Sequence, residues 1–214
     1  TTTSTTVALV DDGILRIGLL APLSGPGADL GRSIQHAAEF AVTRVNEAGG
    51  VGGRAVRLIV QDEGPDVTTA TRGLDQLLGS DVDAIIGPAS NQVALALLGG
   101  LVDDGVLTCS ATASAIALDQ YPDTGLFVRT VPSDAMAAEA MARSIDQTGR
   151  ALIGIIHVDD AYGRTYADAL VGRVNSRALS VVERIAYSPN AADVSADVDR
   201  LVDAGAEVVA VIGD

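Results

Sequence analysis

Short apolar runs and amphipathic stretches alternate along the chain. Runs rich in Ile, Leu and Val predict strands, and apolar residues that recur every three to four positions predict helices. Helix 33–46 is the clearest case, because its apolar residues share one face and Gly49-Gly50 ends it. In this part of the chain, strands are expected at 14–20, 56–60, 82–86, 105–109 and 126–131, and helices at 33–46, 67–78, 91–103 and, more briefly, 114–119.

The same alternation restarts after Pro132. Ser133 is a favourable N-cap for an Ala- and Met-rich helix at 135–147, which Gly149 closes. Further strands are expected at 151–157, 179–187 and 207–212, and further helices at 162–175 and 194–204. This βαβα order demands right-handed crossovers and parallel sheets covered by helices on both faces.

The fold class predicted from this order is α/β, with two doubly wound lobes that each hold a parallel sheet. We expect a flexible Thr-rich leader at 1–12, an N-terminal lobe at 13–131 and a second lobe at 132–214. The second lobe has only three predicted strands, so we expect it to be incomplete. The leader suits a spacer between a lipid anchor upstream and the folded body.

Composition narrows the possible partners. The 214 residues include 28 acidic and 14 basic side chains, all of the latter Arg, and carry a net charge of −14. This balance disfavours nucleic acids and anionic membranes as partners. No apolar run approaches the roughly 18 residues of a transmembrane helix. Cys109, the one cysteine, excludes an intrachain disulfide and is interpreted as a small buried hydrophobe.

Small polar residues follow two neighbouring predicted strands. Ser90 and Asn91 come after the strand at 82–86, and Thr112 and Ser114 come after the strand at 105–109. Short hydroxyl and amide side chains, together with free backbone N–H groups at a helix start, hold a carboxylate without a basic residue. The same residue types are also common as turn and N-cap residues, and this alternative remains open.

Residues 15–214 resemble the first part of a type I periplasmic solute-binding protein, of the Leu/Ile/Val-binding branch that feeds ABC importers. The resemblance depends on the order and spacing of several stretches taken together. They are IGLLAPLSGP at 17–26 followed by Gly31, NEAGGVGGR at 46–54, IIGP at 85–88, the loop region 105–118, FVRTVPSD at 127–134 and DAYG at 160–163.

The resemblance implies two Rossmann-like lobes that close on a small ligand, a branched-chain or related amino acid. It implies a non-enzymatic protein without a cofactor or metal, which works with an ABC permease in the periplasm or outside the cell, with the option of a lipid anchor. The carboxylate would lie at Asn91, the main chain of Thr112 and Ser114. The full set of implied ligand-binding residues is Leu30, Ser90, Asn91, Thr112, Ala113, Ser114, Tyr162 and Asp214.

Some positions depart from the branch. Asn91 replaces a frequent Ser, and Leu30 and Asp214 replace residues that are often aromatic, so the preferred ligand side chain could differ. Tyr162 matches a position that contacts the ammonium end of the ligand, but it equally suits packing at a helix start. The acidic partner of the ammonium, and the return segment that completes the first lobe, are expected beyond residue 214.

Two alternative functions also fit parts of the sequence pattern. The same fold serves as the sensing domain of receptors and regulators. A dinucleotide-binding oxidoreductase is suggested by the glycines at 25–31 and by Asp62 after the second strand. However, Pro26 removes a backbone donor that phosphates would need. His36 and His157 lack metal-ligand spacing, which favours solvent-facing or structural roles for both.

Overall fold

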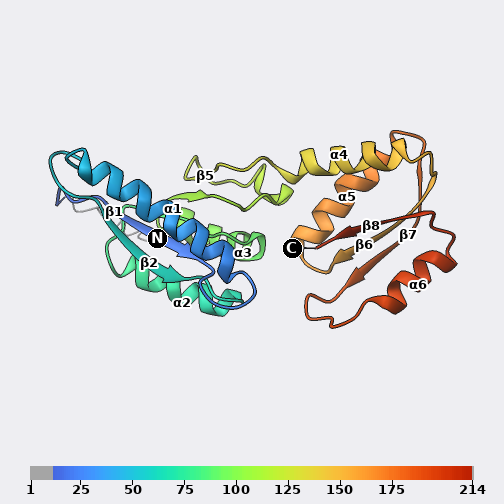
Figure 1. The fold of residues 1–214 in the computed structure, drawn as a ribbon, viewed down its shortest axis with the longest axis horizontal. Coiled ribbons are helices and arrows are strands. Elements are labelled where there is room, and N and C mark those ends of the chain that lie inside the picture. Colours follow the sequence, from blue (N-terminus) through green and yellow to red (C-terminus); the bar gives the residue numbers. More distant parts are fainter. Residues whose placement is uncertain (1–11, 214) are drawn as a thin grey trace, which may run out of the picture. The chain divides into compact units, whose positions relative to one another are not determined.

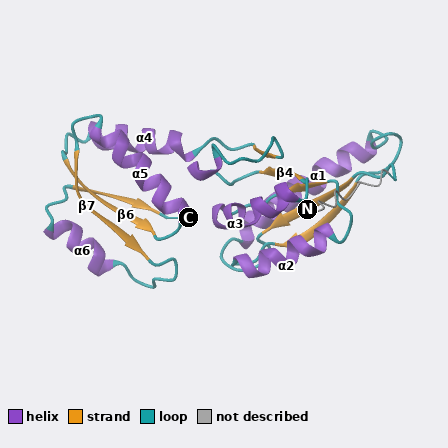
Figure 2. Cartoon of the chain, turned by 180° about the vertical axis from the view of Figure 1, so that it is seen from behind, coloured by secondary structure: helices purple, strands orange, loops and turns teal. Residues whose placement is uncertain are grey.

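The computed structural model describes residues 12–213, and its contacts divide them into two compact units. The first unit contains residues up to Ala113 together with Pro122–Val131. The second contains Ser114–Tyr121 and the chain from Pro132 onwards. Both units are α/β (Figures 1 and 2). Except for Asp12, the Thr-rich leader and also Asp214 lie outside the described residues.

The first unit is built on a five-stranded parallel sheet in the order β2-β1-β3-β4-β5. Its strands are β1 (Arg16–Ala21), β2 (Arg57–Asp62), β3 (Ala84–Ile86), β4 (Leu107–Ser110) and β5 (Phe127–Arg129). Its helices are α1 (Ala28–Glu47), α2 (Val67–Leu78) and α3 (Asn91–Asp103). Each helix connects two parallel strands, as the alternating pattern predicts.

Successive residues of the central strands point to opposite faces of this sheet. Leu20 and Ile85 pack in one core cluster with Leu77 of α2 and residues of α3. Leu19 packs in a second cluster with Ala38 of α1, on the other face. Strands buried on both faces require continuous apolar runs, which explains why β1 and β3 lack polar alternation.

The second unit is a smaller α/β layer around a three-stranded parallel sheet in the order β7-β6-β8. β6 is central, and Ile153, Ile155 and Ile156 on it are almost fully buried. The elements are the 3₁₀-helix η1 (Ile116–Leu118), α4 (Asp134–Gln147), β6 (Leu152–Val158), α5 (Ala161–Asn175), β7 (Ser180–Tyr187), α6 (Ser195–Asp203) and β8 (Val208–Ile212). Ser133 caps α4 as expected, with its hydroxyl accepting a hydrogen bond from the Ala135 N–H.

Helix α1 begins five residues before its expected start. The sequence pattern penalises this first turn because it contains Gly31, a poor helix former. The structure explains the glycine: a Cβ at this position would lie 1.8 Å from the carbonyl oxygen of Pro22. The close approach of α1 to the loop after β1 therefore demands a residue without a side chain.

Asp62, at the end of β2, fastens the loop that joins β1 to α1. Its Oδ1 atom accepts hydrogen bonds from the N–H groups of Leu23 and Gly64, both at 2.7 Å, and of Ser24 at 3.2 Å. Partial burial raises the pKa of Asp62, but hydrogen bonds from the Ser24 side chain and the loop backbone outweigh this effect. The pKa of the carboxyl therefore lies below its ordinary value.

Replacing Asp62 tests how much its hydrogen bonds to the loop contribute to stability. Because its pKa is lower in the folded chain, Asp62 contributes stability above its unfolded pKa of about 3.9, and this contribution is lost as pH falls through the folded value. We expect Asp62→Asn to lower the free energy of unfolding by about 1–3 kcal/mol at neutral pH. The difference from the wild type should shrink in acid. Urea unfolding at both pH values measures it.

Asp75→Asn is the matched control, because Asp75 is exposed on α2 and the substitution makes the same chemical change. This control should unfold like the wild type. An Asp62→Asn variant as stable as the wild type at neutral pH, or a difference that persists unchanged in acid, would contradict the role assigned to Asp62.

Candidate functional site

The polar residues after β3 and β4 lie at the same edge of the first sheet. β3 and β4 are parallel neighbours, with Ile86 paired to Cys109, so their carboxyl ends adjoin. β3 leads into residues 87–90, which we call the β3–α3 loop, and β4 leads into residues 111–113. Ligand sites of parallel sheets occur at such strand ends.

Hydroxyl groups from the end of β4 hold the β3–α3 loop in place. Ser110 Oγ donates to the carbonyl oxygen of Pro88 at 2.6 Å, and Thr112 Oγ1 donates to that of Ala89, also at 2.6 Å. Ser110 is fully buried and also accepts a hydrogen bond from the Ala113 N–H at 2.9 Å. Thr112 and the β3–α3 loop, which follow two neighbouring strands, are thus in direct contact.

Three of the backbone donors expected to be free are already bonded. The Thr112 N–H donates to Ser110 Oγ at 3.4 Å. The N–H groups of Ala89 and Ser90 donate to the two carboxylate oxygens of Glu63, at 2.6 and 2.9 Å. The expectation that the amides at this helix start await a ligand is therefore wrong for these two. The reason is Glu63, which directly follows β2 and is not among the residues predicted to belong to the site.

Ser90 and Asn91 lie at the start of α3. Ser90 is the N-cap, and its Oγ accepts a hydrogen bond from the Val93 N–H at 3.3 Å. This is the capping role that its residue type suggested as the alternative to ligand contact. Asn91 is the first residue of α3 and is only 5% exposed, so most of its side chain packs inside the first unit.

Ser114 belongs to the second unit, where it is paired with Asp134 at the start of α4. Its hydroxyl donates to Asp134 Oδ2 at 2.8 Å, and the Asp134 N–H donates to the Ser114 carbonyl oxygen at 2.9 Å. Because an ionised carboxylate only accepts, the hydrogen of Ser114 is directed to Asp134. The Ser114 hydroxyl is therefore the donor of this pair.

Tyr162 lies in the first turn of α5 and is 8% exposed. Its ring packs edge-to-face against Tyr166, with ring centroids 6.0 Å apart, and its hydroxyl reaches the Gly213 carbonyl oxygen at 3.5 Å. Burial, followed by the charge of Asp134, raises the pKa of Tyr166. These contacts give Tyr162 a packing role in the second unit, to which Ser114 also belongs.

The remaining candidate positions differ in what they contact. Leu30 is 49% exposed near the start of α1, so its side chain is available at the surface of the first unit. Ala113 is fully buried. Asp62, which the oxidoreductase alternative needs for a ribose, is engaged by the loop after β1 instead.

Neither histidine is placed for metal binding. His36 is exposed on α1. His157 is buried, with Nδ1 bonded to the Val158 carbonyl oxygen at 2.8 Å and Nε2 accepting from Arg184 Nε at 2.9 Å. Among residues 12–213, no group of three His, Cys, Asp or Glu side chains could hold a metal ion. Of the described helices, none has the length and hydropathy that would span a membrane.

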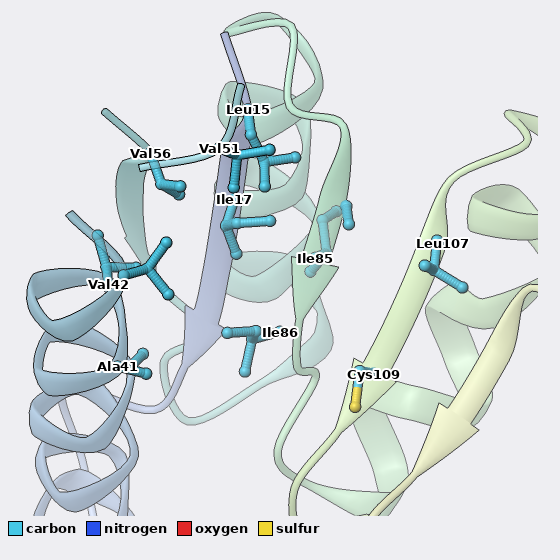
Figure 3. Close-up of a pocket in the computed structure, with 13 residues that line it drawn as sticks. Leu15, Ile17, Ala41, Val42, Val51, Val56, Ile85, Ile86, Leu107 and Cys109 are labelled. Atoms are coloured by element: carbon cyan, nitrogen blue, oxygen red, sulfur yellow. The ribbon is translucent and has the colours of Figure 1, made fainter. Parts of the chain in front are cut away.

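A groove of about 360 Å³ lies elsewhere in the first unit, between α1 and the sheet. Figure 3 shows aliphatic side chains from α1 and from the strands converging on it. Such a lining offers no partner to a charged group, so the groove is unsuited to an amino acid. The lining residues are Leu15, Ile17, Ala38, Ala41, Val42, Val45, Val51, Val56, Ala84, Ile85, Ile86, Leu107 and Cys109.

The chain belongs to the Periplasmic binding protein family, whose profile matches residues 14–214. It is 32% identical over 196 residues to the Leu/Ile/Val-binding protein homolog 3 of Brucella melitensis. The match covers 91% of this chain and 53% of that protein. The chain therefore spans about half the length of the curated relatives it matches.

Solved structures show the same fold. A type 1 periplasmic binding protein from Bordetella pertussis matches with a TM-score of 0.82 and 25% identity, over 94% of this chain and 56% of that one. An ABC transporter substrate-binding protein from Desulfitobacterium hafniense, solved in complex with Leu, matches with a TM-score of 0.73 and 22% identity, over 92% and 58%. The fold class and the family inferred from the sequence motifs are confirmed.

Thr112→Val tests the contact between the two loops. The substitution keeps the shape of the side chain but leaves the Ala89 carbonyl oxygen without its hydroxyl donor. We expect the free energy of unfolding to fall by about 0.5–1.5 kcal/mol, and the amides of the β3–α3 loop to exchange faster. Urea unfolding and amide hydrogen exchange measure these effects. Thr71→Val, on the exposed side of α2, is the control and should leave loop exchange unchanged.

Proposed function

We propose that this chain is part of an extracytoplasmic solute-binding protein of an ABC importer, which binds a branched-chain or related amino acid. The observation that carries the proposal is the meeting of the β3–α3 loop and Thr112 at the carboxyl end of the first sheet. An amide side chain at a helix start, here that of Asn91, suits a carboxylate. No enzymatic step is part of the proposal.

The proposed contacts are divided between the two units. Leu30, Asn91 and Thr112 belong to the first, and Ser114 and Tyr162 belong to the second. Ser114, whose hydroxyl donates to Asp134, stays a proposed contact of the amino acid. We propose that an amino acid is bound by residues of both units and that these contacts stabilise lobe closure.

The comparisons support this choice of ligand and partner. The Brucella relative is named a Leu/Ile/Val-binding protein homolog, and the Desulfitobacterium structure is an ABC transporter substrate-binding protein in complex with Leu. We propose the same ligand class, and an ABC permease as the partner. A location outside the cytoplasm, with a lipid anchor, belongs to the same proposal.

Calorimetric titration of the full-length gene product with L-leucine, L-isoleucine and L-valine tests the proposed function. We expect saturable binding of at least one of these amino acids. The ligand should also stabilise the protein by about 2.7 kcal/mol at a concentration one hundred times its Kd, which raises the melting temperature. A full-length protein that binds none of the three, nor any other amino acid, would contradict the proposal.

Ser114→Ala tests one contact within this function. We expect roughly tenfold weaker binding of the amino acid that the wild type prefers, because a hydrogen bond to a charged group contributes about 1.5–3 kcal/mol. Ser188→Ala, at an exposed position of the second unit, is the matched control and should bind normally. Equal affinity of Ser114→Ala and the wild type would remove Ser114 from the site.

A further inference from the structure

We propose that Glu63 is the positioning residue of the candidate carboxylate site. In this view its buried carboxylate sets the conformation of the β3–α3 loop and thereby presents Asn91 and Thr112 to the ligand. The inference rests on the proposed function for its ligand, but the hold of Glu63 on the loop can be tested without one.

The burial of Glu63 is the first argument. Its exposed fraction is zero, and it is the only acidic or Arg residue in the buried class between residues 12 and 213. A carboxylate removed from water is strongly unfavourable unless its oxygens are hydrogen-bonded. Here each oxygen accepts one backbone N–H from the β3–α3 loop, Oε2 from Ala89 and Oε1 from Ser90.

The second argument is that the loop is held from two sides, by an acceptor that faces its N–H groups and by donors that face its carbonyl groups. From the end of β2, Glu63 accepts from the N–H groups of the loop. From the end of β4, the hydroxyls of Ser110 and Thr112 donate to its carbonyl oxygens. Only a conformation that points two N–H groups one way and two carbonyl groups the other satisfies both sides. Glu63 therefore selects one arrangement of this loop.

The third argument concerns Gly87, where the loop leaves β3. Its φ is +117°, and a Cβ there would lie 2.1 Å from the Leu20 carbonyl oxygen. The glycine lets the loop pass close over β1. Because glycine is conformationally free, it permits this backbone conformation but does not enforce it. At Gly87 the backbone fixes the start of the loop, because its N–H donates to the Cys109 carbonyl oxygen at 2.8 Å. Beyond this point side chains hold the loop, and Glu63 supplies the hydrogen bonds to Ala89 and to the N-cap Ser90.

This arrangement also restricts how a ligand is bound. Two consecutive amides before a helix form a natural anion cradle. Glu63 fills this cradle from within the protein, so the carboxylate of a ligand must use other donors. Asn91 is the next residue along the chain and the first of α3, so its position follows from that of the loop.

Glu63→Gln in the full-length gene product is the central experiment. The variant side chain can still accept one loop N–H, but its NH₂ group faces the other. We expect faster hydrogen exchange of the Ala89 and Ser90 amides in ligand-free protein. We also expect roughly tenfold weaker binding of L-leucine, used as the probe, by calorimetry.

Two control variants separate positioning from general destabilisation. Glu39→Gln makes the same chemical change at an exposed position of α1 and should alter neither readout. Leu77→Ala removes a fully buried side chain on α2 and lowers stability without touching the loop. It should melt at a lower temperature yet bind L-leucine normally. Should Glu63→Gln not fold, Glu63→Asp, which keeps the charge but shortens the reach, replaces it.

The outcomes are distinguishable. Unchanged exchange of Ala89 and Ser90 in the Glu63 variant overturns the proposal. A Glu63 variant with faster loop exchange but unchanged affinity for L-leucine also overturns the proposal. The same holds if Leu77→Ala loses as much affinity as the Glu63 variant. If the wild type binds no amino acid, the proposed function fails, while the exchange measurement still decides whether Glu63 holds the loop.

Discussion

Backbone N–H and carbonyl groups that are buried at the edge of a parallel sheet need hydrogen-bond partners. In this protein that requirement determines the structure of the candidate site. The β3–α3 loop has two N–H groups and two carbonyl groups that side chains from β2 and β4 satisfy. Because β2 and β4 belong to the same sheet, the position of the loop depends on the positions of these two strands. The direction of α3, and with it the placement of Asn91, follows from this short segment.

The strands and helices could be predicted from the sequence because their signals are local. Leu19 and Leu20 are consecutive apolar residues, and so are Ile85 and Ile86. In each pair, one residue packs in the core on one face of the sheet and the other packs on the opposite face. Helix α2 has the predicted bounds, since Asp66 caps it and its apolar face is regular. The early start of α1 was missed because Gly31 argues against a helix until the nearby Pro22 carbonyl is known.

The candidate site was less predictable, because its decisive contacts join distant parts of the chain. Ser90, Thr112 and Ser114 could be found from residue type and strand ends. Glu63 could not, since its partners lie 26 and 27 residues later, and one acid after a strand resembles any solvated carboxylate. The same holds for Asp134, which decides whether the hydroxyl of Ser114 donates or accepts. Residue types located the polar edge, but only the structure shows which of its groups are already engaged.

The surface position of Leu30 has a consequence for how such proteins diversify. Leu30 takes no part in either core cluster of the first unit and is 49% exposed, whereas Glu63 and Ala113 are sealed inside. Substitutions at Leu30 can therefore accumulate at little cost in folding, while changes at the sealed positions disturb the framework. The chemistry of this outer turn of α1 can therefore vary from one relative to the next while the framework beneath it keeps its structure.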